Sequence, residues 1–135
     1  MRIAVDVDNV LADLATAFLR EVNEDFSTQY GREDITKWHI WDCLPVFNDI
    51  LNREAAKALV WRYFDLAWLN VDDMPVVSGA VEGVKKLVSQ GHWVDLVTSR
   101  RWNSVGDLAD WLRRHFYENG QPLFKSLVVL DAFAG

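Results

Sequence analysis

The sequence predicts an α/β fold in which a small parallel sheet carries a helical segment inserted after the first strand. Apolar runs at residues 2–7, 93–97 and 127–130 are typical of strands buried on both faces. Segments of helical periodicity separate these runs, as in strands joined by crossover helices. Between residues 27 and 73 the residue pattern changes to polar turns mixed with aromatic residues, which indicates the insert.

The helices follow from apolar periodicity. After the first strand, an apolar stripe at helical spacing covers residues 10–25, and a second long helix is expected over residues 52–69. Residues 80–90 predict a third helix. Ser104 and Asp107 resemble a capping pair for a fourth helix, which leads towards the last strand.

Composition limits the function classes. Half of the 135 residues are hydrophobic, so a core can form. The net charge of −6 argues against binding a polynucleotide backbone, which needs clustered Lys and Arg. The single cysteine, Cys43, excludes an internal disulfide and fits a reducing compartment. No apolar stretch reaches the roughly 20 residues that cross a bilayer. We therefore expect a cytoplasmic protein that binds neither polynucleotides nor membranes.

Polar side chains follow each predicted strand. Asp6 and Asp8 end the first strand, Thr98 and Ser99 end the second, and Asp131 ends the last. Parallel strands bring their carboxyl ends to one edge of a sheet, where α/β proteins collect functional groups. We expect these side chains to meet there, although each pattern alone is also common in turns and helix caps.

Phosphoryl chemistry suits this set of side chains. An ionised Asp6 is a nucleophile for phosphorus, and Mg²⁺ offsets its repulsion from a phosphate. Asp8 can protonate the leaving alkoxide and then activate water. Thr98 or Ser99 could hold a phosphoryl oxygen, and Lys125 could neutralise its charge.

Three segments resemble the motifs of the haloacid dehalogenase (HAD) superfamily of phosphohydrolases. The run DVDNVLAD at residues 6–13 is similar to the first motif of its 5′(3′)-deoxyribonucleotidases, with Asn9 in place of a glycine. The stretch from Pro75 to the LVTSR run at residues 96–100 resembles the second motif and the helix before it. Lys125 and the run after it are similar to the third and fourth motifs.

The resemblance implies a role for each matching residue. Asp6 would be the nucleophile and a Mg²⁺ ligand, and Asp8 the acid/base, which also gives the metal its backbone carbonyl. Thr98 would bind the phosphoryl group and Lys125 would neutralise it. Asp131 would be the remaining metal ligand.

The resemblance also implies the architecture. Residues 1–13 and 74–135 would form a HAD-like Rossmannoid core with three layers, α/β/α, and residues 14–73 a helical cap. A closed cap excludes water and adds substrate contacts. A sheet this small leaves an exposed edge that favours pairing with a second copy.

Substrate contacts are expected from the cap and from the second strand. Four of the seven tryptophans lie between residues 38 and 68, and Trp41 and Trp68 are our candidates for stacking on a nucleobase. The alternative is that they fill a helical core. Arg100, directly after Ser99, is expected near the phosphate.

The function predicted from these features is Mg²⁺-dependent hydrolysis of a phosphomonoester through an aspartyl-phosphate, with a nucleoside monophosphate as substrate. One alternative is a non-catalytic HAD-like binding or regulatory protein, because Ala132 follows Asp131 where the family carries a second acid. Another alternative is a HAD phosphatase for a different small phosphorylated metabolite.

Overall fold

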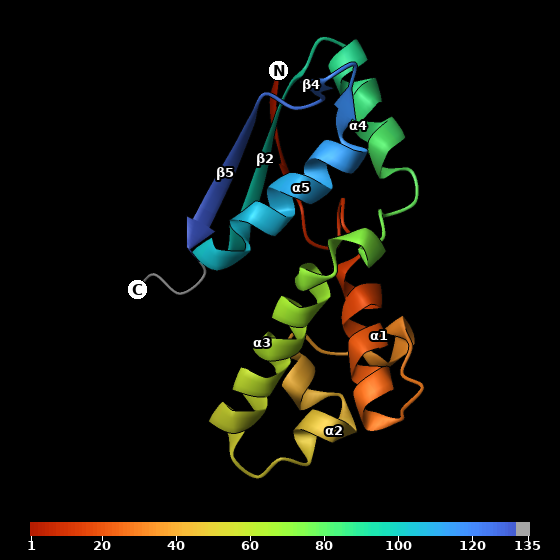
Figure 1. Cartoon of the computed structure of the whole chain (residues 1–135), viewed down its shortest axis with the longest axis vertical. Helices are drawn as coiled ribbons and strands as arrows, with labels where there is room; N and C mark the ends of the chain where they lie inside the picture. The colour runs from red at the N-terminus through yellow and green to blue at the C-terminus, as the bar shows by residue number, and fades with distance from the viewer. Residues whose placement is uncertain (132–135) are drawn as a thin grey trace.

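A three-stranded parallel sheet forms the centre of the fold (Figure 1). The computed structural model describes residues 1–131, with the side chain of Asp131 excepted. The strands β1 (Arg2–Asp6), β2 (Trp93–Arg100) and β5 (Ser126–Asp131) lie in the order β1-β2-β5. In this register Asp6 lies opposite Val97, and Thr98 lies opposite Val129. The strands therefore end at one edge of the sheet, as predicted.

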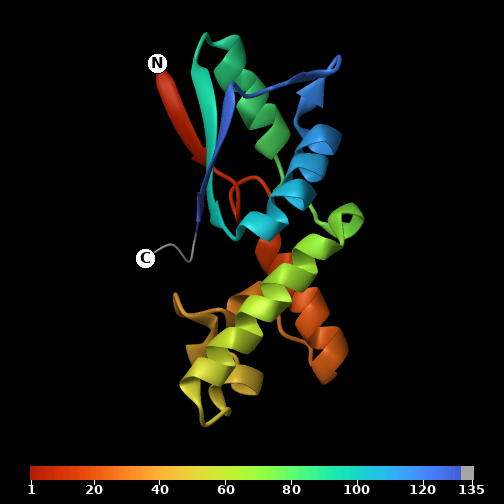
Figure 2. The same ribbon diagram turned by 60° about the vertical axis from the view of Figure 1, so that its left-hand side comes forward.

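Two helices cover one face of the sheet. Figure 2 shows α4 (Ala80–Ser89) and α5 (Val105–His115) together on this side. Their apolar faces pack on Val94 and Leu96 of β2, and Trp111 of α5 is fully buried there. No helix within residues 1–131 covers the other face of the sheet, so the described chain supplies two of the three predicted layers.

The inserted segment folds into a helical cap with its own apolar cluster. Helices α1 (Leu14–Phe26), α2 (Pro45–Asn48) and α3 (Arg53–Leu69) form it at the lower end of Figure 1. Two short 3₁₀ turns, Arg32–Asp34 and Ile40–Asp42, connect α1 to α2. The buried members of this cluster are Phe18, Leu19, Val22, Leu44, Phe47, Val60 and Tyr63.

The ends of the cap helices belong to the core of the sheet. Leu14 begins α1, and Ala67 and Trp68 lie in the last turn of α3, yet all three pack in the cluster that contains β2 and α5. A 3₁₀ turn, Val71–Asp73, then leads back towards α4. The cap is thus anchored by its two ends, and the boundaries at residues 14 and 73 stay a prediction.

Two local features differ from the sequence-based predictions. Ser104 caps α5 without a side-chain bond to the helix, because its hydroxyl donates to the Arg101 carbonyl within the 3₁₀ turn Trp102–Ser104. Between α5 and the last strand, where the sequence predicted no strand, the chain forms a small hairpin of β3 (Tyr117–Glu118) and β4 (Gln121–Pro122). Its two central residues both have positive φ, which the Asn-Gly pair favours.

Residues 1–131 contain no helix with the length and hydropathy that a membrane span requires.

Candidate active site

The polar residues at the end of β2 belong to the strand, so their side chains alternate between the two faces of the sheet. The sequence predicted an apolar strand over residues 93–97 that finishes in polar residues, and β2 includes these residues and ends at Arg100. Because side chains alternate along a strand, Thr98 and Arg100 point to the helix-covered side and Ser99 to the other. Thr98 and Arg100 are accordingly 1% and 5% exposed, whereas Ser99 is exposed.

A tight turn after β1 separates the two aspartates. The carboxylate of Asp6 accepts a hydrogen bond from the Val7 amide at 2.8 Å. Asn9 then adopts a φ of 62°, and its side-chain oxygen accepts from the Ala15 amide at the start of α1. Asparagine tolerates this left-handed conformation, which explains how it stands where the related motif has glycine. The turn carries Asp8 towards the buried side of β2.

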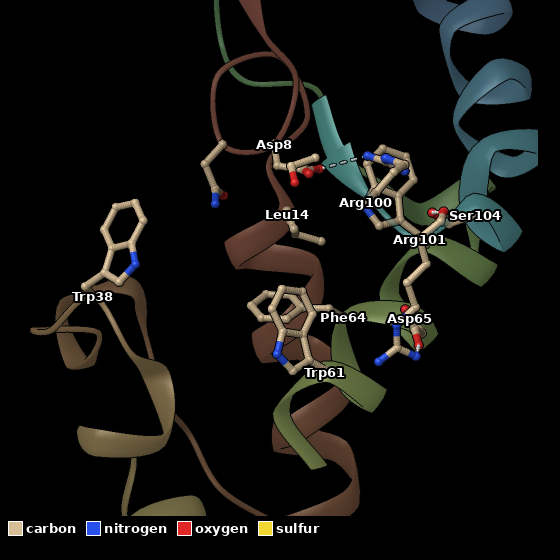
Figure 3. Close-up of a pocket in the computed structure, with 12 residues that line it drawn as sticks. Asp8, Leu14, Trp38, Trp61, Phe64, Asp65, Arg100, Arg101 and Ser104 are labelled. Atoms are coloured by element: carbon tan, nitrogen blue, oxygen red, sulfur yellow. Dashed lines mark hydrogen bonds and ion pairs between the residues drawn. The ribbon is translucent and has the colours of Figure 1, made fainter. Parts of the chain in front are cut away.

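Asp8 lies at the centre of a polar cluster (Figure 3). Nη2 of Arg100 donates to its Oδ1 at 3.1 Å, and the Thr98 hydroxyl makes a long contact of 3.5 Å with its Oδ2. Burial raises the pKa of the Asp8 carboxyl, and the negative charge of Asp6 raises it further. The Arg100 charge and hydrogen bonds from Trp68 and Thr98 oppose this shift. A carboxyl with a raised pKa is suited to donate a proton.

Arg100 is a buried cation with spare donors. Its guanidinium carbon lies 4.3 Å from the ring centroid of Trp68, which is a cation–π contact. Within the described residues, Nε and Nη1 of Arg100 are buried and have no hydrogen-bond partner. Unpaired buried donors are costly, so these two groups are suited to bind an anion that enters the site.

A cavity of about 290 Å³ opens beside this cluster. Asp8 and Arg100 lie at its polar end, and aromatic side chains form its far end (Figure 3). Ser99 also lines the cavity. Trp38 is 94% exposed and lies across the opening from Trp61. The remaining lining residues are Asn9, Leu14, Phe64, Asp65, Trp68, Arg101 and Ser104.

Asp6 faces a separate hollow on the uncovered side of the sheet. This hollow has a volume of about 380 Å³ and is lined by Asp6, Thr98, Ser99 and three apolar residues, Ala4, Val97 and Leu130. Ser99 lines both this hollow and the cavity that contains Asp8. The two aspartates thus lie on either side of the strand tips, with Ser99 between the two openings.

Lys125 is not brought to this site. It precedes β5, and its amide donates to the carbonyl of Val94 near the start of β2. Its ammonium nitrogen lies 5.6 Å from the ring centroid of Trp93. Thr98 lies four residues beyond Val94 along β2, which corresponds to roughly 13 Å at the rise of a strand. Closeness in sequence to Asp131 was misleading, because the two residues flank a whole strand.

Asp131 is placed only by its backbone. It lies opposite Arg100 in the register of β2 and β5, so the central strand separates it from β1. Its side chain and Ala132 lie outside the described residues, and its role as a metal ligand stays a prediction.

The two tryptophans chosen from the sequence have different positions. Trp68 is 5% exposed and lines the cavity, but its indole packs edge-on against Trp111 as part of the core. Trp41 does not line this cavity, and instead stacks on His39 at 4.5 Å.

Sequence reasoning missed other lining residues of α3. Trp61, Phe64 and Asp65 line the cavity together with the predicted Trp68, and the four residues are spaced i, i+3, i+4 and i+7. This spacing puts them on one face of the helix, and it could have identified the set.

The described residues contain no group of three or more His, Cys, Asp or Glu side chains that could hold a metal ion. Mg²⁺ is nevertheless commonly held by one or two carboxylates together with water and substrate phosphate. Asp6 and Asp8 are close enough for one charge to raise the pKa of the other, a repulsion that a cation would relieve. The donors present therefore fit Mg²⁺.

Solved structures with similar folds include several HAD-type hydrolases. A haloacid dehalogenase-like hydrolase from Bacteroides fragilis matches with a TM-score of 0.60 and 13% identity, over 99% of this chain and 65% of that one. A HAD hydrolase from Entamoeba histolytica matches with a TM-score of 0.55 and 14% identity, over 100% and 64% of the two chains. A magnesium-bound HAD hydrolase from Bacillus subtilis matches with a TM-score of 0.51 and 16% identity, over 95% and 64%. The chain thus spans about two thirds of the length of these proteins and has a HAD-like α/β fold.

A sequence family covers most of the chain. No curated protein matches the sequence. Residues 1–124 match the family described as "5' nucleotidase, deoxy (Pyrimidine), cytosolic type C protein". This range includes both aspartates of the first motif and the whole of β2. The chain belongs to this 5′-nucleotidase family, as the resemblance of its motifs predicted.

Proposed function

We propose that the protein hydrolyses nucleoside monophosphates through an aspartyl-phosphate intermediate on Asp6. The observation that carries this proposal is a cavity with Asp8 and Arg100 at one end and aromatic side chains at the other, which shares Ser99 with the adjacent hollow that Asp6 lines. A phosphoryl group needs the polar environment and a nucleobase needs the aromatic one. Membership of a nucleotidase family supports the same conclusion.

The first step is attack of an Asp6 carboxylate oxygen on phosphorus. The bond between phosphorus and the ester oxygen breaks, and the leaving oxygen takes a proton from Asp8, whose raised pKa favours the protonated form. The buried guanidinium of Arg100 offers Nε and Nη1 to the phosphoryl oxygens, and Ser99 offers a hydroxyl between the two openings.

The second step regenerates the enzyme. Asp8, now a carboxylate, accepts a proton from water while the water oxygen attacks phosphorus. The bond between phosphorus and Asp6 breaks, and inorganic phosphate leaves. Asp6 and the Asp8 carbonyl would hold Mg²⁺, which when bound offsets the repulsion between the nucleophile and the phosphate. The structure of similar fold from Bacillus subtilis is bound to magnesium, which is consistent with a Mg²⁺ site in this fold.

The aromatic end supports a nucleotide rather than a sugar phosphate. Trp61 and the exposed Trp38 present ring faces on which a base can stack. The family description names deoxy and pyrimidine, so deoxyuridine 5′-monophosphate is the first substrate to test. Its "cytosolic type" is consistent with the predicted cytoplasmic location.

Replacement of the nucleophile tests the proposal. We expect Asp6→Asn to lower kcat for deoxyuridine 5′-monophosphate by about 10³-fold or more, because an amide is a poor nucleophile. Circular dichroism and thermal unfolding should stay close to those of the parent, since Asp6 is exposed. The exposed variant Asp110→Asn is the control and should keep its activity. Equal turnover by Asp6→Asn would show that Asp6 is not the nucleophile.

The alternatives predict different results. A HAD phosphatase for another metabolite would prefer a sugar phosphate over every nucleotide in a substrate panel. A non-catalytic binding protein would show no turnover, and titration calorimetry would detect no Mg²⁺ binding at millimolar concentrations.

A further inference from the structure

An ion pair joins the cap to the sheet at the side of the cavity. Nη1 of Arg101, the residue after β2, lies 2.9 Å from Oδ2 of Asp65 on α3. Both side chains are more than a third exposed, at 39% and 37%, and both line the cavity (Figure 3). They lie between the polar end of the cavity, at Asp8 and Arg100, and its aromatic end. Neither the proposed chemistry nor the family motifs use this pair.

The position of Asp65 on α3 makes the pair important for the shape of the cavity. One turn towards the helix C-terminus, Trp68 is buried against Trp111 of the core. One turn towards the N-terminus, Trp61 forms part of the aromatic end. Asp65 therefore lies between the buried end of α3 and the turn that carries Trp61, which belongs to the aromatic end of the cavity.

The packing around the ion pair is loose. A second hollow of about 100 Å³ lies beside it, lined by Asp65, Leu69, Asn103, Ser104 and Asp107. Asp65 therefore borders open space in the cavity and in this second hollow, whereas of these two Arg101 lines only the cavity. Loosely packed contacts of this kind allow rigid elements to move relative to one another.

We propose that Asp65 and Arg101 form a latch, an ion pair that holds α3 against the end of β2. The latch thereby positions the aromatic end of the cavity opposite Asp8 and Arg100. Both are positioning residues, because they act through Trp61 and its neighbours. The latch itself follows from the ion pair and its surroundings, and its effect on substrate binding rests on the proposed phosphatase function. An exposed ion pair is weak and sensitive to salt, which suits a contact that must open for substrate to enter.

Steady-state kinetics test the effect on substrate. We expect Asp65→Asn to raise KM for deoxyuridine 5′-monophosphate about twofold to fivefold with little change in kcat, which is the range for an exposed ion pair. The charge swap Asp65→Arg with Arg101→Asp should restore KM. Asp110→Asn breaks an exposed Asp–Arg pair within α5 and should leave KM unchanged.

The kinetics also distinguish the latch from direct substrate binding. If Arg101 bound the phosphate itself, Asp65→Asn would release it and lower KM, and the charge swap would not restore binding. Either result would overturn the latch. Thermal unfolding should confirm that the variants are folded, as expected for partly exposed positions.

A distance measurement tests the latch without any activity. In a Cys43→Ser background, spin labels at Ala58→Cys on α3 and Ser89→Cys on α4 report the distance between cap and core by electron paramagnetic resonance. We expect Asp65→Asn to broaden the distribution and shift it to longer distances. About 1 M salt should do the same to the protein with its ion pair intact, and Asp110→Asn should not.

An unchanged distribution in Asp65→Asn would overturn the latch, whether or not the protein is a phosphatase. A changed distribution without nucleotidase activity would support the latch and reject the proposed function.

Discussion

Arg100 shows how one side chain can contribute to both the stability and the chemistry of the site. It is 5% exposed, pairs with Asp8 through one nitrogen and leaves two buried nitrogens unpaired among the described residues. Burial lowers the pKa of its guanidinium, and the charge of Asp8 opposes that shift. The sequence predicted Arg100 near the phosphate, and its contact with the acid/base candidate depends on the continuation of β2 through Arg100.

Replacement of Arg100 should change how activity depends on pH. The positive charge of Arg100 lowers the pKa of Asp8, so Arg100→Gln should raise that pKa further. If protonated Asp8 is the acid, activity is lost as pH rises through its pKa, and the alkaline limb of the kcat/KM profile should move to higher pH. Loss of a charged hydrogen bond should also reduce the free energy of unfolding by about 2 kcal/mol, measured in urea.

Arg113→Gln, at an exposed position, is the matched control. It should change neither the alkaline limb of the kcat/KM profile nor the free energy of unfolding. A limb that stays in place, or that moves to lower pH, would contradict the assignment of Asp8 as the acid.

Residue types at strand ends were predictable, but their partners were not. Asp6, Asp8 and Thr98 could be found because a strand that ends in polar residues is visible in the sequence. Lys125 was misplaced because it precedes the last strand, and a residue before a parallel strand lies at the edge of the sheet opposite the carboxyl ends. Trp61 was missed because tryptophans of the cap were judged singly and not by their spacing on a helix.

At the scale of elements, β2 organises the molecule. It pairs with both β1 and β5, and its Asp95 connects all three strands. Oδ2 of Asp95 accepts from Arg2 of β1 at 2.6 Å, and Oδ1 accepts from Ser126 of β5 at 2.6 Å and from the Trp93 indole at 2.8 Å. This network lies on the face of the sheet that no described helix covers, and it stabilises that face by hydrogen bonds.

Asp95 should make the free energy of unfolding depend on pH in the acidic range. The hydrogen bond from Ser126, together with Arg2, lowers the pKa of Asp95 below its ordinary value. Its contribution is then complete above the pKa of an unfolded aspartate, near 3.9, and is lost as pH falls through the lower folded value. Urea unfolding should show stability that declines below about pH 4 and less of this decline in Asp95→Asn.

The variant Asp110→Asn, which alters an exposed carboxylate, should keep the parent's acid dependence. An equally steep decline in Asp95→Asn would mean that other carboxyls account for it.

Periodicity predicted the elements better than their ends. The helices over residues 52–69 and 80–90 agree closely with α3 and α4 because their apolar faces span several turns. The cap of α5 could not be predicted, since a hydrogen bond from Ser104 to the preceding turn decides it. The hairpin after α5 has strands of two residues, too short for any periodic signal.

At the scale of the whole molecule, two apolar clusters meet at the site. The cap cluster and the sheet cluster share Phe64, which packs against both and lines the cavity. The cavity therefore forms where the cap joins the sheet, and substrate binding is expected to depend on how the two are held together. Sequence patterning separated the insert from the core, but it could not show that the ends of α1 and α3 belong to the core.

The central claim is that Asp6 forms the covalent intermediate, and chemical trapping tests it most directly. In Asp8→Asn, p-nitrophenyl phosphate can still phosphorylate Asp6, because nitrophenolate leaves without a proton, but the water step lacks its base. The phosphoenzyme should accumulate, and borohydride reduction followed by tandem mass spectrometry should locate the modified residue. We predict modification at Asp6; release of nitrophenolate with no modification at Asp6, or with modification elsewhere, would contradict the account.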